Sequence, residues 1–124
     1  MRKIHYLLPA ALLLSACVTE GYEGQTGTMM SGDQIIGRRE ANRTISVYET
    51  KPAGHRSMGE VSARRCHRSF VEDAPNLAAI TDDLKVAAYT QGADAISNIQ
   101  TKQMNGLLAN CWYVIEGTAQ IWRK

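Results

Sequence analysis

"DAPNLAAITDDLKVAAYTQGADAI", Asp73 to Ile96, is the stretch of the 124-residue chain that decides the fold. It begins with residue types that start a helix, because Asp73 or Asn76 can cap the first turn and Pro75 suits that turn sterically. Gly92 is the residue type that most often ends a helix. A helix is therefore predicted between Asn76 and Gly92.

The apolar side chains inside this stretch recur at steps of three and four residues, which is typical of an amphipathic helix. Asp82, Asp83 and Lys85 are expected to face outward from it. The helix is therefore expected to lie on a sheet with its apolar side buried. The residues that form this side are Leu77, Ile80, Leu84, Ala87 and Ala88.

Segments on both sides of the helix combine β-forming residues with alternating polarity and predict strands. An irregular basic loop is expected up to about Glu72, and residues 102–110 form a second loop, in which Leu107-Leu108 has no obvious partner. The result is a small α+β domain, with an antiparallel or mixed sheet of three to four strands covered by one amphipathic helix. The predicted strands are 44–49, 58–63, 94–101 and 111–122, the last with a bulge at Gly117.

The N-terminus has the order of an export signal: Arg2 and Lys3, an apolar run, then the small pair Ser15-Ala16. The apolar run has about ten residues, whereas a membrane-spanning helix needs roughly 20. Leu14-Ser15-Ala16-Cys17 looks like a bacterial lipobox, in which cleavage after residue 16 leaves Cys17 as the lipidated first residue. The alternative is an ordinary secretory signal with a chance cysteine.

The segment after the lipobox predicts a tethered protein. Residues 17–43 are rich in glycine and show no sustained period, so they are expected to form a lipidated flexible tether, followed by a folded domain at 44–124. Val18 stands where an aspartate would favour retention in the inner membrane, which points to the outer membrane. The domain is then expected in the periplasm, held stably by the two or three acyl chains of a lipoprotein.

The net charge gives no reason to expect a nucleic-acid partner. The chain carries a formal charge of +2, but the signal peptide holds two of its fourteen basic residues and none of its twelve acidic ones. The mature protein is therefore near neutral, and only local patches can act electrostatically.

Cys66 and Cys111 remain once Cys17 is assigned to the lipid. Cysteines of exported proteins are expected to pair, so a disulfide is predicted. The alternatives are free thiols or a metal site, because both cysteines with His55 and His67 could in principle bind zinc. Adjacent Cys66-His67 is poor geometry for one ion, and His67 is expected to be a solvated loop residue.

Arg64, Arg65 and Arg68 form the densest basic patch, with Arg56 nearby in the sequence. They are either solvated side chains or a docking surface for an anionic partner, such as a lipopolysaccharide phosphate or an acidic protein face. No catalytic residues are proposed, since the serines lack a G-x-S-x-G context and the paired carboxylates Asp82-Asp83 are expected on an exposed helix face. An enzyme is not expected, and no metal or other cofactor is predicted.

Several short motifs, taken in order and with the lipobox, resemble the RcsF-like family of outer-membrane lipoproteins, which feed envelope stress to the Rcs phosphorelay. The similarity covers about residues 45–121. The motifs are Val47-Tyr48, Met58-Gly59-Glu60-Val61-Ser62, Cys66, an Ala-rich helix, Gly92-Ala93-Asp94-Ala95-Ile96, Cys111 and Gly117-Thr118-Ala119.

The resemblance implies a small α+β domain, a lipid anchor, and a sensor that contacts outer-membrane barrel proteins and an inner-membrane signalling partner. The family carries two disulfides, and here the positions near Thr101 and Ile115 are not cysteine, so one whole bridge is missing. The tether is also short and lacks the family's proline-rich, basic character. Two alternatives stay open: a small-ligand or metal-binding envelope lipoprotein, and a purely structural lipoprotein.

Overall fold

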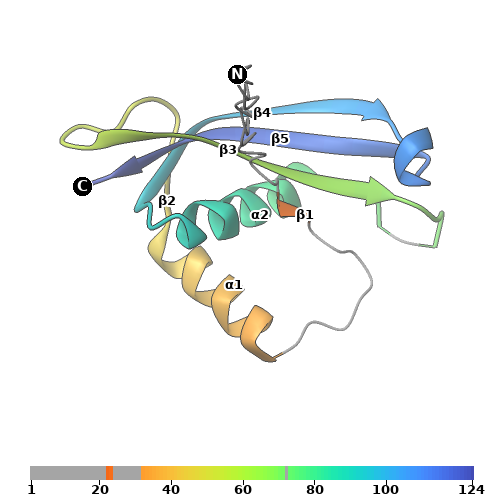
Figure 1. The fold of residues 1–124 in the computed structure, drawn as a ribbon, viewed down its shortest axis with the longest axis horizontal. Coiled ribbons are helices and arrows are strands. Elements are labelled where there is room, and N and C mark those ends of the chain that lie inside the picture. The colour runs from red at the N-terminus through yellow and green to blue at the C-terminus, as the bar shows by residue number, and fades with distance from the viewer. Residues whose placement is uncertain (1–21, 24–31, 72) are drawn as a thin grey trace, which may run out of the picture.

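A computed structural model describes residues 22–23, 32–71 and 73–124 of the chain. In this part, one mixed β-sheet forms a layer and two helices lie on one side of it (Figure 1). The predicted signal peptide 1–16 and the predicted lipid site Cys17 lie outside the described residues. No helix among the described residues is long and apolar enough to cross a membrane.

The sheet is built around β5 (Tyr113–Arg123), the last strand of the chain. β3 (Arg56–His67) and β4 (Ala95–Asn105) flank it and run antiparallel to it. Two short strands lie outside these and run parallel to their neighbours: β2 (Ser46–Tyr48) beside β4, and β1 (Tyr22–Glu23) beside β3. The order β1-β3-β5-β4-β2 confirms the predicted α+β class with a mixed sheet.

The helix predicted from the Asp73 to Ile96 stretch is α2 (Leu77–Thr90). Asn76 is its N-cap, and its side-chain oxygen accepts a hydrogen bond from the backbone N–H of Ala79 at 2.9 Å. Gly92 follows the helix with a φ of +77°, a left-handed conformation that glycine adopts without steric cost. The signals at Asn76 and Gly92 are thus confirmed, whereas Pro75 precedes the N-cap and lies outside the first turn.

The core lies between α2 and the sheet. Ile80 and Leu84, at the centre of the helix, are fully buried. They pack with one side of the three long strands, because alternate residues of a strand point to the same side. The strand residues in this cluster are Val61, Ala63, Ile96, Ala119 and Ile121.

A second helix, α1 (Gly32–Thr44), lies below α2 on the side away from the sheet (Figure 1). Its main contacts are with α2, and Ala41 is fully buried. The prediction of one helix is therefore wrong. Residues 32–43 belong to the segment predicted to be a flexible tether but lie in α1, and Tyr22 and Glu23 of the same segment lie in β1. This segment lacks a broad apolar side, so helical periodicity gave no signal.

β3 is longer than predicted. It pairs with β5 from Arg56 to His67, so residues 64–67, expected in an irregular loop, belong to a strand. This difference determines where the basic side chains point, because neighbours along a strand face opposite sides of the sheet.

The irregularities of the sheet also differ from the prediction. The register shifts between Ser57 and Gly59 in β3 and between Ser97 and Gln100 in β4. Gly117 pairs in regular register with both neighbouring strands, so the bulge predicted there is wrong. Gly117 serves another purpose: a Cβ at this position would lie 2.2 Å from Cγ2 of Ile80, so the absent side chain lets α2 approach the sheet.

Gly117→Ala is expected to lower the free energy of unfolding by about 1–3 kcal/mol, because the added methyl group overpacks the core against Ile80 and Leu84. Urea denaturation followed by circular dichroism measures the change. Gly37→Ala is the control: it lies inside α1 with no atom within 4 Å of the added Cβ, and we expect a gain of about 0.5–1 kcal/mol. Equal effects of the two substitutions would contradict the close approach of α2.

Candidate functional site

Five large apolar side chains gather at one end of the sheet, in the two loops that follow β3 and β4. We call this group the apolar end. Leu108 is fully exposed, and the other four are between 56% and 86% exposed. The short 3-10 helix η1 (Leu107–Ala109) and the end of β3 lie beside each other there, remote from β2 (Figure 1). The apolar end consists of Phe70, Val71, Leu107, Leu108 and Trp112.

A disulfide holds the two loops together. Cys66, near the end of β3, is bonded to Cys111, just before β5, with 5.7 Å between their Cα atoms. The predicted bridge is therefore confirmed. The backbone N–H of Trp112 also donates to the carbonyl oxygen of His67 at 2.9 Å. The loops are thus joined by a covalent bond and by the sheet's own hydrogen-bonding pattern.

Aromatic contacts arrange the side chains of the apolar end. The rings of Phe70 and Trp112 are stacked, with centroids 5.7 Å apart. Trp112 also meets the ring of His67 edge-on at 5.4 Å, and Tyr113 lies 5.0 Å from the same ring. His67 is only 8% exposed, so the prediction that it is a solvated loop residue is wrong.

The loop that carries Leu107 and Leu108 is also held closely. The Asn105 side-chain oxygen accepts from the backbone N–H of Leu107 at 2.8 Å, and the N–H of Cys111 donates to the carbonyl of Gly106 at 2.8 Å. A Cβ at Gly106 would lie 2.4 Å from the Cys111 carbonyl oxygen, so this turn accepts only glycine without moving. The two leucines are therefore presented outward by an ordered turn.

The three arginines predicted to bind a partner do not form one surface. Arg64 and Arg65 are neighbours in β3 and point to opposite sides of the sheet. Both of these two arginines make an ion pair within the protein. The Nε atom of Arg64 is 2.6 Å from a carboxylate oxygen of Glu116, and that of Arg65 is 2.6 Å from a carboxylate oxygen of Asp83. Arg68 lies just beyond the strand and is exposed. Of the three, Arg68 is the best placed to meet a partner.

Glu116 lies at the centre of the face turned away from the helices. It stands directly between Arg64 of β3 and Lys102 of β4, whose ammonium nitrogen is 3.4 Å from its carboxylate. Burial raises the pKa of Glu116, but hydrogen bonds and charge attraction from Arg64 and Lys102 outweigh burial and hold the pKa below its ordinary value of 4.5. These cross-strand pairs support the sheet.

On the helix side, Asp83 is fully buried, so the expectation that it faces outward is wrong. Its carboxylate accepts hydrogen bonds from the guanidinium of Arg65 at 2.6 and 3.0 Å, and from Arg38 of α1. A buried carboxylate requires such partners, because loss of hydration is costly for a charged group. The sequence did not indicate this network, since its members lie 18 and 45 residues apart.

The four residues considered for zinc are not brought together. Both cysteines are in the disulfide, and His55 and His67 lie at opposite ends of β3. The Nδ1 atom of His55 is 2.9 Å from the carbonyl oxygen of Ala53. Among the residues that the structure describes, no group of three or more His, Cys, Asp or Glu side chains could hold a metal ion.

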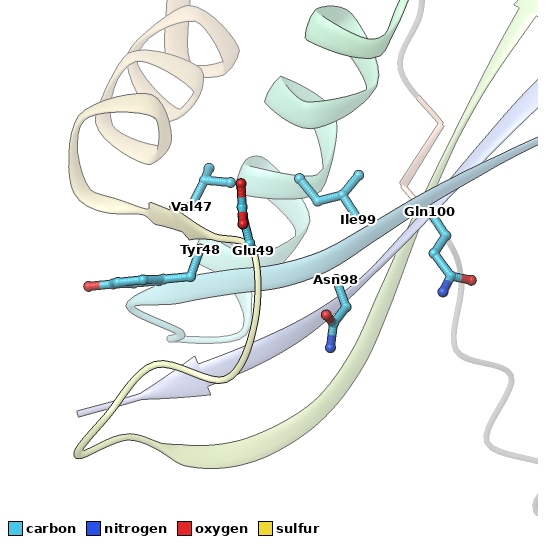
Figure 2. A pocket seen from close by; sticks show the side chains of 6 residues that line it. All are labelled: Val47, Tyr48, Glu49, Asn98, Ile99 and Gln100. Atoms are coloured by element: carbon cyan, nitrogen blue, oxygen red, sulfur yellow. The ribbon is translucent and has the colours of Figure 1, made fainter.

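An open groove of about 480 Å³ lies at the far end of the sheet from η1, where β2 ends and β4 continues. Figure 2 shows Ile99 pointing to the helix side, as Val47 and Glu49 do, while Asn98 and Gln100 point the other way. Among the residues that line the groove, Glu49 carries the one carboxylate. The groove thus brings one carboxylate together with amide, phenol and apolar side chains.

Comparison with known proteins found no matching family model and no significant match among curated proteins. The resemblance to the RcsF-like family therefore stays a prediction that rests on the motifs quoted above.

Asp83→Asn is expected to lower the free energy of unfolding by about 3–5 kcal/mol, because it removes the buried carboxylate charge that the guanidinium groups of Arg65 and Arg38 meet. Chemical denaturation measures the loss, and proteolysis within α1 should become faster. Asp82→Asn removes a carboxylate from the neighbouring position, which is less buried, and we expect a change within about 0.5 kcal/mol. Similar losses in both variants would show that the buried network contributes little.

The stability that Glu116 contributes is expected to depend on pH. Because its pKa is lowered in the folded state, the contribution is fully present above about pH 4.5 and is lost as the pH falls through the folded value. In Glu116→Gln, the free energy of unfolding should therefore decline less steeply between about pH 5 and pH 3 than in the wild type. Glu60→Gln, which removes an exposed carboxylate of the same strand, is the control for the loss of one negative charge. A wild-type slope in Glu116→Gln would contradict this role.

Proposed function

We propose that the protein is a lipid-anchored lipoprotein of the bacterial outer membrane, with a periplasmic domain that acts as a non-enzymatic module for protein interaction or envelope-stress signalling. The observation that carries this proposal is the Cys66–Cys111 disulfide in a chain whose N-terminus reads as an export signal with a lipobox. Disulfides persist in exported proteins and are rare in the cytosol.

The disulfide also supports a role that requires a stable folded domain. It closes a loop between residues 45 positions apart, for which the chain-entropy estimate of stabilisation is about 4 kcal/mol. A domain of this size has a total stability on the order of 5–15 kcal/mol, so the bridge is a large share of it. The domain is thus suited to an oxidising compartment.

The arrangement of charges favours an interaction module over an enzyme. The carboxylates and guanidinium groups that the structure brings closest together, at Asp83 and Glu116, are engaged in ion pairs between elements of the fold. Their contacts hold helices and strands in place. Arg68, in contrast, is exposed beside the disulfide, where a partner can reach it. The RcsF-like resemblance suggests that such partners are outer-membrane barrel or inner-membrane signalling proteins.

Cys17→Ala is expected to abolish lipidation, so the protein should no longer float with membranes in a density gradient. In a strain that lacks the gene, the wild type should restore the level of an envelope-stress reporter and Cys17→Ala should not. Val18→Ala, which keeps the cysteine, is the control and should behave as the wild type does.

A photo-crosslinker at Arg68 should capture an outer-membrane barrel or an inner-membrane signalling protein, while the same group at Arg39, exposed on α1, should not. If deletion leaves the stress reporter unchanged and the crosslinker at Arg68 captures no envelope protein, the signalling role is overturned.

A further inference from the structure

We propose that the apolar end inserts into the surface of the lipid bilayer, so that the domain lies on the membrane by a second contact besides its lipid. The inference rests on the proposed lipid anchor. The apolar end is the largest group of exposed apolar side chains among the described residues, and the folding of the domain leaves these side chains in water. A contact with the bilayer would bury them. Apolar patches of this kind mark contacts with a partner or a membrane.

The shape of the apolar end suits a bilayer. Leu107 and Leu108 are 80% and 106% exposed, and Phe70 and Val71 are 85% and 86% exposed, so these side chains project outward from the ends of two loops. A projection needs a complementary hollow if its partner is a protein, whereas acyl chains adapt to any apolar shape. The disulfide and the stacked rings hold the projection in place, so insertion requires little further ordering.

The residue types agree with an interfacial depth. Trp112 is 56% exposed and lies next to the buried ring of His67, at the inner boundary of the projection. Tryptophan is enriched at the boundary between headgroups and acyl chains, because its ring is apolar and its N–H is polar. The two leucines, the valine and the phenylalanine are more exposed than Trp112, so they are the side chains most available to hydrocarbon.

Charge does not account for the proposed contact. The loop after β3 carries one positively charged side chain, Arg68, and two negatively charged ones, Glu72 and Asp73. By its sequence, this loop therefore offers no net attraction to anionic lipid. The contact is therefore driven by burial of apolar area, and it should be as strong on a zwitterionic bilayer as on an anionic one. This property separates it from a polybasic membrane contact.

The length of chain between the anchor and the sheet allows both contacts at once. Tyr22 of β1 pairs beside Ala63 of β3, and β3 continues from there to His67 at the apolar end. This part of β3 is about 13 Å long. Four residues separate Cys17 from Tyr22, and the five Cα–Cα steps between them span up to about 17 Å. This length is enough for Cys17 to lie level with His67, at the base of the apolar end.

The test uses the exported protein, extracted in detergent and reconstituted into phosphatidylcholine vesicles with or without brominated acyl chains. Of the two tryptophans, Trp122 is 6% exposed and donates to Ser97 at 2.8 Å, so Trp112 is the one that lipid can reach. We expect brominated lipid to quench the Trp112 emission, with a shift of the emission to the blue. Quenching should be the same at low and high salt.

The double substitution Leu107→Asp and Leu108→Asp should abolish this quenching, because two charged side chains replace the most exposed part of the projection. Both positions are exposed, so circular dichroism and the disulfide should stay as in the wild type. Ile36→Asp is the matched control: Ile36 is 65% exposed on α1, at a distance from the apolar end, and quenching should persist.

The outcomes separate this inference from the proposed function on which it rests. If the wild type floats with the vesicles but brominated lipid leaves its tryptophan emission unchanged, the membrane contact is overturned and the anchor stands. If the exported protein does not float, both are overturned. Quenching that persists in the double variant, or that disappears in high salt, also overturns an apolar contact through Leu107 and Leu108.

Discussion

Asp83 joins three elements that are far apart in the chain. It lies on α2 without exposed surface, and its carboxylate accepts hydrogen bonds from Arg38 of α1 and Arg65 of β3. A buried carboxylate is stable only when nearby groups compensate its charge, and Arg38 and Arg65 do so here. The placement of α1 beneath α2 and the attachment of α2 to β3 therefore depend on one charged group in a small core.

Because side chains alternate along β3, its neighbouring arginines face opposite sides of the sheet and stabilise different contacts. Arg65 faces the helices and meets Asp83, while Arg64 faces the other side and meets Glu116 beside Lys102. Charges that are neighbours in the sequence thus stabilise different layers of the fold. The side chains exposed after the end of β3 are chiefly apolar, with Phe70 and Val71 beside Arg68.

The sequence predicted well those features that depend on nearby residues. The cap at Asn76 and the left-handed Gly92 involve positions within a turn of the helix ends, and the pairing of Cys66 with Cys111 followed from an even count of cysteines. The second helix escaped prediction, because Ala41 is the fully buried residue among residues 36–44 of α1 and the helix is held by contacts with α2. Periodicity detects a helix only where a broad apolar side exists.

By itself, the sequence determined the position of α2, the α+β class and the cysteine pair, since capping, periodicity and cysteine count can be read without knowledge of distant contacts. Only the tertiary structure decided which charges are internal and which apolar side chains stay exposed. Arg64 and Glu116 are 52 residues apart, and Phe70 and Trp112 come from different loops. The burial of a side chain depends on what the fold brings against it, and that partner can stand anywhere in the chain.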